Sequence, residues 1–327
     1  MTAELRRDPL SGQEVIIAPG RAGRPHGDLL DDESEKLPEP PAECPLCPGN
    51  EHLTPPTTLA LPGGGTAQPW SVRVIPNLYP IVSSHGEDDR GHPGRSTTGV
   101  HEVVVETPHH HEELADRDPS QVVLLLEAFQ IRLRDLEGRL RTRQVQVFKN
   151  KGSEAGTSLE HPHSQIVALD FLPELTARRV QRARRYHQRE GGCLLCAVVA
   201  DERARGDRLV IEDEGFVALA PYASLWAGEV QVIPLSHAPS FTAIDTHERE
   251  LLARHLIALA GRLKATFDDP PYNLVLQTAP ARRLEDPALH WYWQLTPRMT
   301  RKAGLEVGSG IHVNPLPPEE TAALLRA

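Results

Sequence analysis

Apolar and polar residues alternate along two segments in the first half of the chain, and a segment with helical periodicity follows them. Residues 70–82 (WSVRVIPNLYPIV) and 99–111 (GVHEVVVETPHHH) are rich in β-branched residues, so their alternation predicts strands. Residues 122–140 (VVLLLEAFQIRLRDLEGRL) carry apolar residues at the spacing of a helix, which Asp118 or Ser120 can cap.

Further strands are predicted around a turn. The segments 144–150 (QVQVFKN) and 165–169 (QIVAL) are typical of strands, and 151–158 (KGSEAGTS) between them contains turn residues. Residues 27–69 are rich in proline, glycine and acidic residues, which predicts surface loops around the sequence CPLCPGN.

The second half of the chain repeats this order. Residues 216–237 predict two strands, and residues 246–267 (THERELLARHLIALAGRLKATF) predict a helix that Thr246 can cap. Residues 272–279 (YNLVLQTA) and 289–298 (LHWYWQLTPR) end the series as strands.

Motifs recur together with the elements. C-x-x-C, a strand ending in P-x-H or P-x-x-H, a long helix, a strand and H-x-(H/Y)-x-Q occur twice in this order. The interval from the first motif histidine to the second is 51 residues in one copy and 53 in the other. A duplicated unit with variable loops explains this agreement. We therefore predict an α+β fold of two tandem units, residues 1–172 and 173–327, each an antiparallel sheet with a long packed helix.

Composition narrows the classes of function. The chain has 327 residues, of which 39% are hydrophobic and 24% charged, as is usual for a globular protein. Its net charge of −10 argues against nucleic-acid binding, although a local cluster of donors can still bind a phosphorylated small molecule. No apolar run approaches the length of a membrane span, and MTAELRRDPL lacks the apolar stretch of a signal peptide. We therefore expect a cytoplasmic protein without membrane contact.

Each copy of the repeat supplies two cysteines and two histidines. Two thiolates and two imidazoles form a closed tetrahedral site that suits a structural Zn²⁺. The alternative is that these are surface cysteines and solvated histidines, and the second set rests on the repeat alone, so we expect one zinc site and a possible second. His109 and His111 flank one candidate and leave its identity open by one position. The candidate ligands are Cys44, Cys47, His110 and His161 in the first set and Cys193, Cys196, His237 and His290 in the second.

His163 and Gln165 remain in the first copy once the ligands are set aside, where the second copy has Tyr292 and Gln294. In a strand, residues two positions apart point to one face, so His161, His163 and Gln165 can reach one site. A tyrosine is a poor nucleophile at neutral pH. His163 is therefore the candidate catalytic residue, the alternative being an ordinary core histidine.

The sequence NKGSEAGTSLEHPHSQ resembles the active-site signature of the galactose-1-phosphate uridylyltransferases, within the histidine-triad superfamily. The resemblance covers nearly the whole chain. RRDPLSGQEVIIAPGRAGRP, CPLCPGN and AGLEVGSGIHVNPLPPEE are similar to the amino-terminal segment, the first zinc half-site and the carboxy-terminal segment of that family.

The resemblance implies a mechanism. His163 would attack the α-phosphorus of a nucleoside diphosphate sugar, form a covalent nucleotidyl-histidine and release a hexose 1-phosphate, which gives ping-pong kinetics. A main-chain carbonyl near His161 would fix the tautomer of the ring. Gln165 would donate a hydrogen bond to the phosphoryl oxygen without a titratable proton, which favours transfer over hydrolysis.

Substrate-binding residues follow from the resemblance as well. The turn before the motif brings backbone donors close to phosphate, unless it is a plain strand connection. The arginines would reach the nucleotide phosphates across a homodimer interface, and an asparagine would contact the nucleoside. These candidates are Arg21, Arg24, Asn77, Asn150, Gly152, Gly156 and Ser158.

Two features depart from the family pattern. Members bind a second metal through a glutamate and three histidines, but Gln277 and Tyr292 stand near two of those positions and ELTARRVQRARRYHQRE offers no evident glutamate. That site is expected to be absent. Near the carboxy terminus, Gly308, Ser309, His312 and Asn314 offer no obvious equivalent of the pair that holds the hexose.

We therefore expect a nucleotidylyltransferase, first of all a UDP-glucose–hexose-1-phosphate uridylyltransferase that binds a nucleotide sugar and a sugar 1-phosphate. The alternative within enzymes is a nucleotide-sugar phosphorylase such as an ADP-glucose phosphorylase, in which phosphate attacks the nucleotidyl-enzyme. A non-catalytic zinc-containing nucleotide-binding module is a third hypothesis, which the His163 and Gln165 pair argues against.

Overall fold

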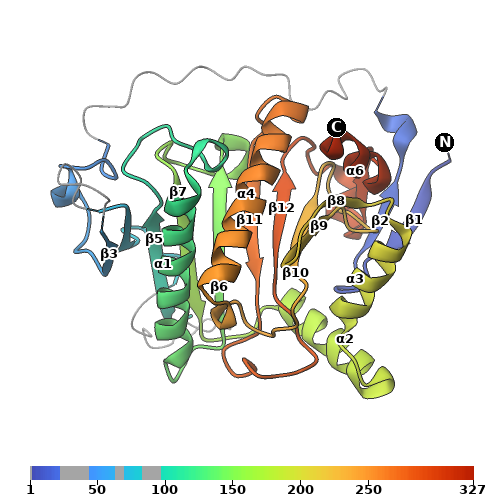
Figure 1. Cartoon of the computed structure of the whole chain (residues 1–327), viewed down its shortest axis with the longest axis horizontal. Helices are drawn as coiled ribbons and strands as arrows, with labels where there is room; N and C mark the ends of the chain where they lie inside the picture. The colour runs from blue at the N-terminus through green and yellow to red at the C-terminus, as the bar shows by residue number, and fades with distance from the viewer. Residues whose placement is uncertain (1, 23–43, 63–69, 83–96) are drawn as a thin grey trace.

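The computed structural model describes residues 2–22, 44–62, 70–82 and 97–327 (Figure 1). Ten of the strands in this part of the chain are β3 Leu59–Leu61, β4 Val72–Pro76, β5 Gly99–Val105, β6 Gln144–Lys151, β7 His163–Leu169, β8 Leu209–Glu212, β9 Phe216–Leu219, β10 Val230–Pro234, β11 Tyr272–Gln277 and β12 Tyr292–Pro297. They form one sheet in the order β3-β4-β5-β7-β6-β11-β12-β10-β9-β8, in which all neighbours are antiparallel.

A smaller sheet joins the two ends of the chain. β1 (Glu4–Arg7) pairs antiparallel with β2 (Glu14–Ile17), and β13 (His312–Asn314) pairs parallel with β2. The helices are α1 Pro119–Gly138, α2 Glu174–Glu190, α3 Leu194–Arg205, α4 Thr246–Phe267, α5 Gly304–Ser309 and α6 Pro318–Arg326, with 3-10 turns η1 Pro19–Arg21, η2 Glu51–Leu53, η3 Leu114–Asp116, η4 Ser153–Ala155 and η5 Phe241–Ala243. Within the residues described, no helix is long and apolar enough to cross a bilayer.

The main core lies between the large sheet and the two long helices. Figure 1 shows α1 and α4 side by side on one face of the sheet. Leu126 and Leu133 of α1 and Leu252 and Leu259 of α4 are fully buried there, against Ile166 of β7. Each such leucine contributes about 2 kcal/mol by leaving water. This helix layer leaves the opposite face of the sheet for other contacts.

The helix starts follow local capping chemistry. Asp118 caps α1, since its carboxylate accepts the N–H of Ser120, as one of the two alternatives predicted. The prediction of Thr246 as the cap of α4 is wrong. Asp245 accepts the Glu248 N–H at 2.8 Å while the Glu248 carboxylate accepts the Asp245 N–H at 3.0 Å, so both donors are satisfied reciprocally.

The predicted α+β architecture is confirmed, but the two units share a single sheet. β6 of the first unit pairs with β11 of the second, and this pairing leaves neither strand as an exposed edge. Phe148 lies opposite Gln165, Val275 lies opposite Gln294, and Phe148 and Val275 lie opposite each other. We call the pairing of β6 with β11 the seam between the two units. Equivalent residues lie opposite each other at this seam, so a local two-fold axis relates the strands of the two units.

Candidate active site and metal centres

Strand β7 carries the candidate catalytic residues on the face of the sheet away from α1 and α4. Ile166 and Ala168 point into the helix-covered core, so His163 and Gln165, at alternate positions, point to the other face. His163 is 7% exposed and Gln165 is partly buried. The H-x-Q spacing thus places both side chains together, as the sequence predicted.

The His163 ring is held in one tautomer. Its Nδ1 lies 2.8 Å from the carbonyl oxygen of His161, and because a carbonyl can only accept, Nδ1 carries the proton. Burial lowers the pKa of His163, although the same hydrogen bond opposes this effect. Nε2 has no hydrogen bond to any residue that the structure describes. The ring is therefore neutral at pH 7 and keeps a free lone pair on Nε2, the form that acts as a nucleophile.

Gln165 is oriented by a histidine that the sequence did not single out. The Ile81 N–H donates to Nδ1 of His101 (3.2 Å), so the proton of the neutral ring lies on Nε2. That Nε2 donates to Oε1 of Gln165 at 2.8 Å, and burial lowers the pKa of His101. The Asn77 amide nitrogen lies 3.1 Å from the same Nε2, a longer contact between two donors. With Oε1 occupied, the amide N–H groups of Gln165 are the part left for a ligand.

The turn before the motif is fixed from the second unit. Asn273 of β11 donates to Oδ1 of Asn150 (2.8 Å) and to the carbonyl of Ala155 (2.9 Å), so the Asn150 amide nitrogen is left as a donor. Gly152 and Gly156 have φ angles of 81° and 92°, which favour glycine. A Cβ on Gly152 would also lie 2.7 Å from Cβ of Pro271.

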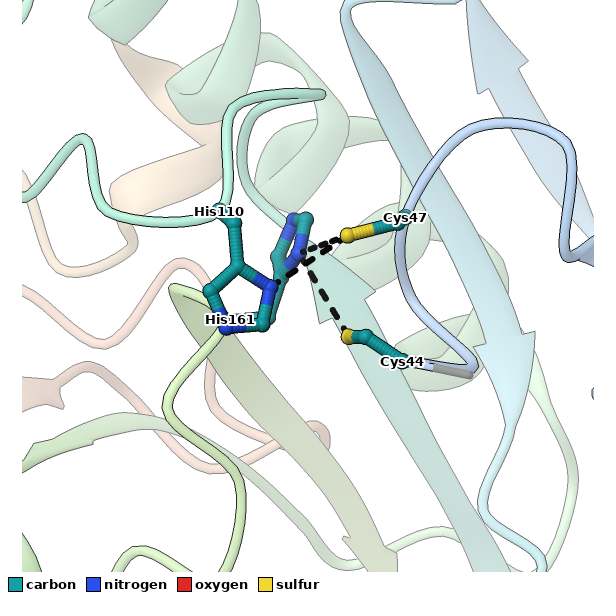
Figure 2. Close-up of side chains that lie close together, drawn as sticks. All are labelled: Cys44, Cys47, His110 and His161. Atoms are coloured by element: carbon teal, nitrogen blue, oxygen red, sulfur yellow. Dashed lines mark hydrogen bonds between the residues drawn. The ribbon is translucent and has the colours of Figure 1, made fainter. Parts of the chain in front are cut away.

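The first set of cysteines and histidines converges on one point (Figure 2). Sγ of Cys47 lies 3.3 Å from Nδ1 of His110 and 3.5 Å from Nδ1 of His161, and Sγ of Cys44 lies 3.8 Å from the latter. The structure therefore selects His110 among the three consecutive histidines. The four side chains can hold a metal ion.

The environment of this set favours a bound cation. Burial and the neighbouring Cys44 raise the pKa of the Cys47 thiol to about 11, so two thiolates here need a positive charge between them. Burial lowers the pKa of His161 to about 4, which keeps this ring neutral and able to coordinate. Its Nε2–H donates to the carbonyl of Thr107 at 2.8 Å, which leaves Nδ1 free for a metal.

The second set has the same geometry. Sγ of Cys196 lies 3.3 Å from Nδ1 of His290 and 3.5 Å from Nδ1 of His237, and Sγ of Cys193 lies 3.9 Å from Nδ1 of His290. The two rings are 5.1 Å apart at 89°, against 5.2 Å and 88° in the first set. The second set can therefore hold a metal ion as the first can, a conclusion that the sequence repeat alone did not support.

Other candidates are placed differently. Asn77 lies beside His101 and so close to Gln165, while Ser158 is exposed in the turn. Arg21 is exposed in η1, which follows β2, and Figure 1 shows β2 at the other end of the molecule from β7. One chain therefore does not bring Arg21 to His163. Arg24 lies outside the described residues.

The carboxy-terminal segment has a structural role at one of the noted positions. Asn314 is fully buried, and its amide donates to the carbonyls of Ser224 and Trp226 at 3.0 and 3.2 Å. In the second unit, Arg179 of α2 donates to Oε1 of Gln277, one of the two residues that the sequence analysis noted near the second-metal positions of the family.

Within the candidate active site, sequence reasoning missed His101 and Asn273. Alternation along β5 puts His101 on the face of Val103, which lies opposite Gln165. The alternation along β5 identifies His101 only when the register of β5 against β7 is known. Asn273 lies opposite Asn150 because β6 pairs with β11. No local sequence pattern predicts this pairing.

A neutral buried histidine with a free Nε2, beside an oriented glutamine amide and a glycine-containing turn, offers the groups that nucleotidyl transfer through a histidine needs. Comparisons with known proteins agree. Two family models match, one described as the N-terminal domain of galactose-1-phosphate uridyl transferase at residues 1–173 and one as its C-terminal domain at residues 179–325. The chain belongs to the galactose-1-phosphate uridylyltransferase family.

Individual relatives cover almost the whole chain. An ADP-glucose phosphorylase of Arabidopsis thaliana is 33% identical over 99% of this chain and 92% of its own length. A galactose-1-phosphate uridylyltransferase of Thermotoga maritima is 28% identical over 99% of this chain and 98% of its own. The crystal structure of the Arabidopsis ADP-glucose phosphorylase with bound ADP-glucose, 30% identical, superposes with a TM-score of 0.85 over 99% of both chains.

Proposed function

We propose that this protein transfers a nucleoside monophosphate from a nucleoside diphosphate sugar to a phosphate-bearing acceptor, through a covalent bond to His163. The observation that carries the proposal is the 2.8 Å hydrogen bond from Nδ1 of His163 to the His161 carbonyl, which leaves Nε2 as an oriented nucleophile. Family membership supports the same chemistry.

The reaction proceeds in two displacements at one phosphorus atom. Nε2 of His163 attacks the α-phosphorus, the N–P bond forms, and the hexose 1-phosphate leaves with the electrons of the broken P–O bond. A phosphate oxygen of the acceptor then attacks the same phosphorus and the N–P bond breaks. The amide of Gln165 and the donors of Asn150 and the Gly152 turn stabilise the charge on the phosphoryl oxygens.

Two acceptors are compatible with this scheme. A hexose 1-phosphate as acceptor makes the protein a UDP-glucose–hexose-1-phosphate uridylyltransferase, and the Thermotoga relative is a galactose-1-phosphate uridylyltransferase. Inorganic phosphate makes it a nucleotide-sugar phosphorylase, a function that the 33% identity and TM-score of 0.85 to the Arabidopsis ADP-glucose phosphorylase support about equally well.

We further propose that both cysteine–histidine sets bind structural Zn²⁺. Zn–S and Zn–N bonds of about 2.3 and 2.0 Å at tetrahedral angles separate sulfur from nitrogen by about 3.5 Å. The sulfur–nitrogen distances here lie between 3.3 and 3.9 Å. Such ions fix Cys44 and Cys196 to the strands that follow His161 and His290, and leave no open position for substrate.

The remaining proposals concern assembly and location. We propose that the boundary between the two units lies between residues 172 and 173. A homodimer would let Arg21 and Arg24 of one chain serve the site of another, which fits the exposure of Arg21 in η1, after β2, and the place of β2 at the other end of the molecule from β7 (Figure 1). The four cysteines are free thiols arranged for metal, which favours a cytoplasmic location.

Intact-mass spectrometry tests the reaction. The metal-loaded protein is mixed with UDP-glucose or ADP-glucose, and a mass gain equal to the matching nucleoside monophosphate less one water is expected. Inorganic phosphate or galactose 1-phosphate is then added, and the compound that removes the adduct identifies the acceptor. Glucose 1-phosphate, the leaving group of both nucleotide sugars, is the control for reversal and should remove the adduct in either case. If no nucleotide sugar ever forms an adduct, a non-catalytic nucleotide-binding module replaces the proposal.

A further inference from the structure

A cavity of about 70 Å³ lies in the second unit, away from His163. Its walls come from the end of β11, the start of β12, helix α2, the first turn of α3 and the loop after β1. Both Gln277 and Tyr292, which lie opposite each other on β11 and β12, line it.

The local two-fold axis relates this cavity to the candidate active site. Gln277 lies two positions after Val275, as Asn150 lies two positions after Phe148, and Val275 and Phe148 are paired equivalents. Tyr292 precedes Gln294 by two positions, as His163 precedes Gln165. The cavity therefore occupies, in the second unit, the place of the motif turn and the nucleophile in the first. Tyr292 stands there in the position of the candidate nucleophile His163.

Arg179 supplies a positive charge to the cavity without a carboxylate partner among the described residues. Its Nη1 donates to Oε1 of Gln277, while its Nε is fully enclosed and has no hydrogen-bond acceptor. Gln277 is held in this orientation because its Nε2 lies 3.4 Å from Oε1 of Gln294, whose own amide donates to Glu229 at 2.8 Å. Nη2 has no hydrogen bond to any described residue, so this end of the guanidinium is left for a ligand.

The chemistry of the lining defines the ligand class. The N–H groups of Nη2 share the charge of the guanidinium and form strong, charge-assisted hydrogen bonds with a carboxylate. The wall beside it is apolar, since Val180, Ala279 and Leu289 form a buried cluster with Ala183 packed against them. We propose that the second unit binds a small organic carboxylate here, with its carboxylate on Arg179 and its short apolar body against this cluster.

Saturation-transfer NMR on the metal-loaded protein tests the site with butyrate and its neutral counterpart butyramide. Butyrate should receive saturation at its methyl group and butyramide should not. Arg179→Met should weaken butyrate binding at least tenfold, because a charge-assisted pair is lost. Arg178→Met is the matched control, since Arg178 is exposed on the same helix and paired with Glu174, and it should bind like the wild type.

A second variant guards against a folding defect in the first. Ala183→Leu fills the apolar part of the cavity and leaves Arg179 in place, so it should also abolish the butyrate signal. Equal binding of butyramide, no binding of butyrate by the wild type, or undiminished binding by Arg179→Met each overturns the proposal. Because no nucleotide is present and His163→Gly should bind butyrate normally, the result is independent of the proposed reaction.

Discussion

His101 offers a direct measure of how orientation of the Gln165 amide contributes to catalysis. The variant His101→Ala removes the 2.8 Å hydrogen bond to Oε1 of Gln165 and leaves the amide free to rotate. A hydrogen bond of this kind contributes about 1 kcal/mol, so the productive orientation should become about fivefold less populated. Gln165→Ala removes the donor itself and should lower the rate of nucleotidyl-enzyme formation about 10²- to 10³-fold.

The assay is the single-turnover rate of nucleotidyl-enzyme formation, measured by rapid quench and intact mass. We expect His101→Ala to lower this rate about three- to tenfold with little change in the KM for the nucleotide sugar. His101→Gln, whose amide can donate to Oε1, should restore part of the rate. In the Gln165→Ala background, His101→Ala should have no further effect, because there is no amide left to orient.

Independent, multiplicative effects of the two substitutions would refute this reasoning. So would a His101→Ala defect as large as that of Gln165→Ala. Because His101 is buried, metal content and Tm are compared with those of the wild type to separate a catalytic defect from a loss of folded protein.

Three further predictions concern the nucleophile, the metal and a buried ionic cluster. His163→Gly should form no nucleotidyl adduct by mass spectrometry and keep the metal content of the wild type. Cys44→Ser should lower bound zinc from two to one ion per chain by elemental analysis and lower Tm by roughly 10 °C or more. Glu106, fully buried, has a pKa that burial alone would raise but that Lys149 and Arg117 lower to about 2 from an ordinary 4.5. Since its folded pKa is the lower one, its stabilisation, on the order of 3 kcal/mol, is present above pH 4.5 and is lost as the pH falls from 4.5 through 2. Glu106→Gln should lower the free energy of unfolding by about 3–5 kcal/mol at pH 7. In denaturant titrations it should also make the free energy of unfolding depend less on pH between 4.5 and 2.

Each of these predictions has an outcome that contradicts it. An adduct on His163→Gly would assign the nucleophile to another residue. Unchanged zinc in Cys44→Ser would show that the first set is not a metal site. An acid-unfolding profile of Glu106→Gln that matches the wild type would remove Glu106 from the account of acid stability.

Much of the site was visible in the sequence because its residues have local signatures. Alternation around HPHSQIVAL places His163 and Gln165 on one face, and the duplicated spacing of cysteines and histidines identifies both sets of candidate ligands. These patterns express the period of a strand and the short reach of a metal ligand, so they need no knowledge of distant pairing.

The residues that escaped prediction depend on register between distant strands. His101 reaches Gln165 from β5, and Asn273 reaches Asn150 across the seam of the two units. The pairing of β6 with β11 could not be inferred, because each strand has the pattern of a buried strand whether its neighbour belongs to its own unit or to the other. Arg179 was missed for a similar reason, since a cation on an exposed-looking helix gives no sign of a cavity beneath it.

The seam between β6 and β11 has a consequence for how such a chain can be divided or assembled. Equivalent residues, Phe148 and Val275, face each other there, so a lone unit would present an unsatisfied β6 edge that another copy of itself could cover about the same axis. Fusing two copies makes that contact permanent. In the fused chain only one copy needs a nucleophile. Tyr292 can therefore occupy in the second copy the position that His163 occupies in the first. Expression of either half alone should therefore yield self-association or aggregation rather than an isolated folded domain.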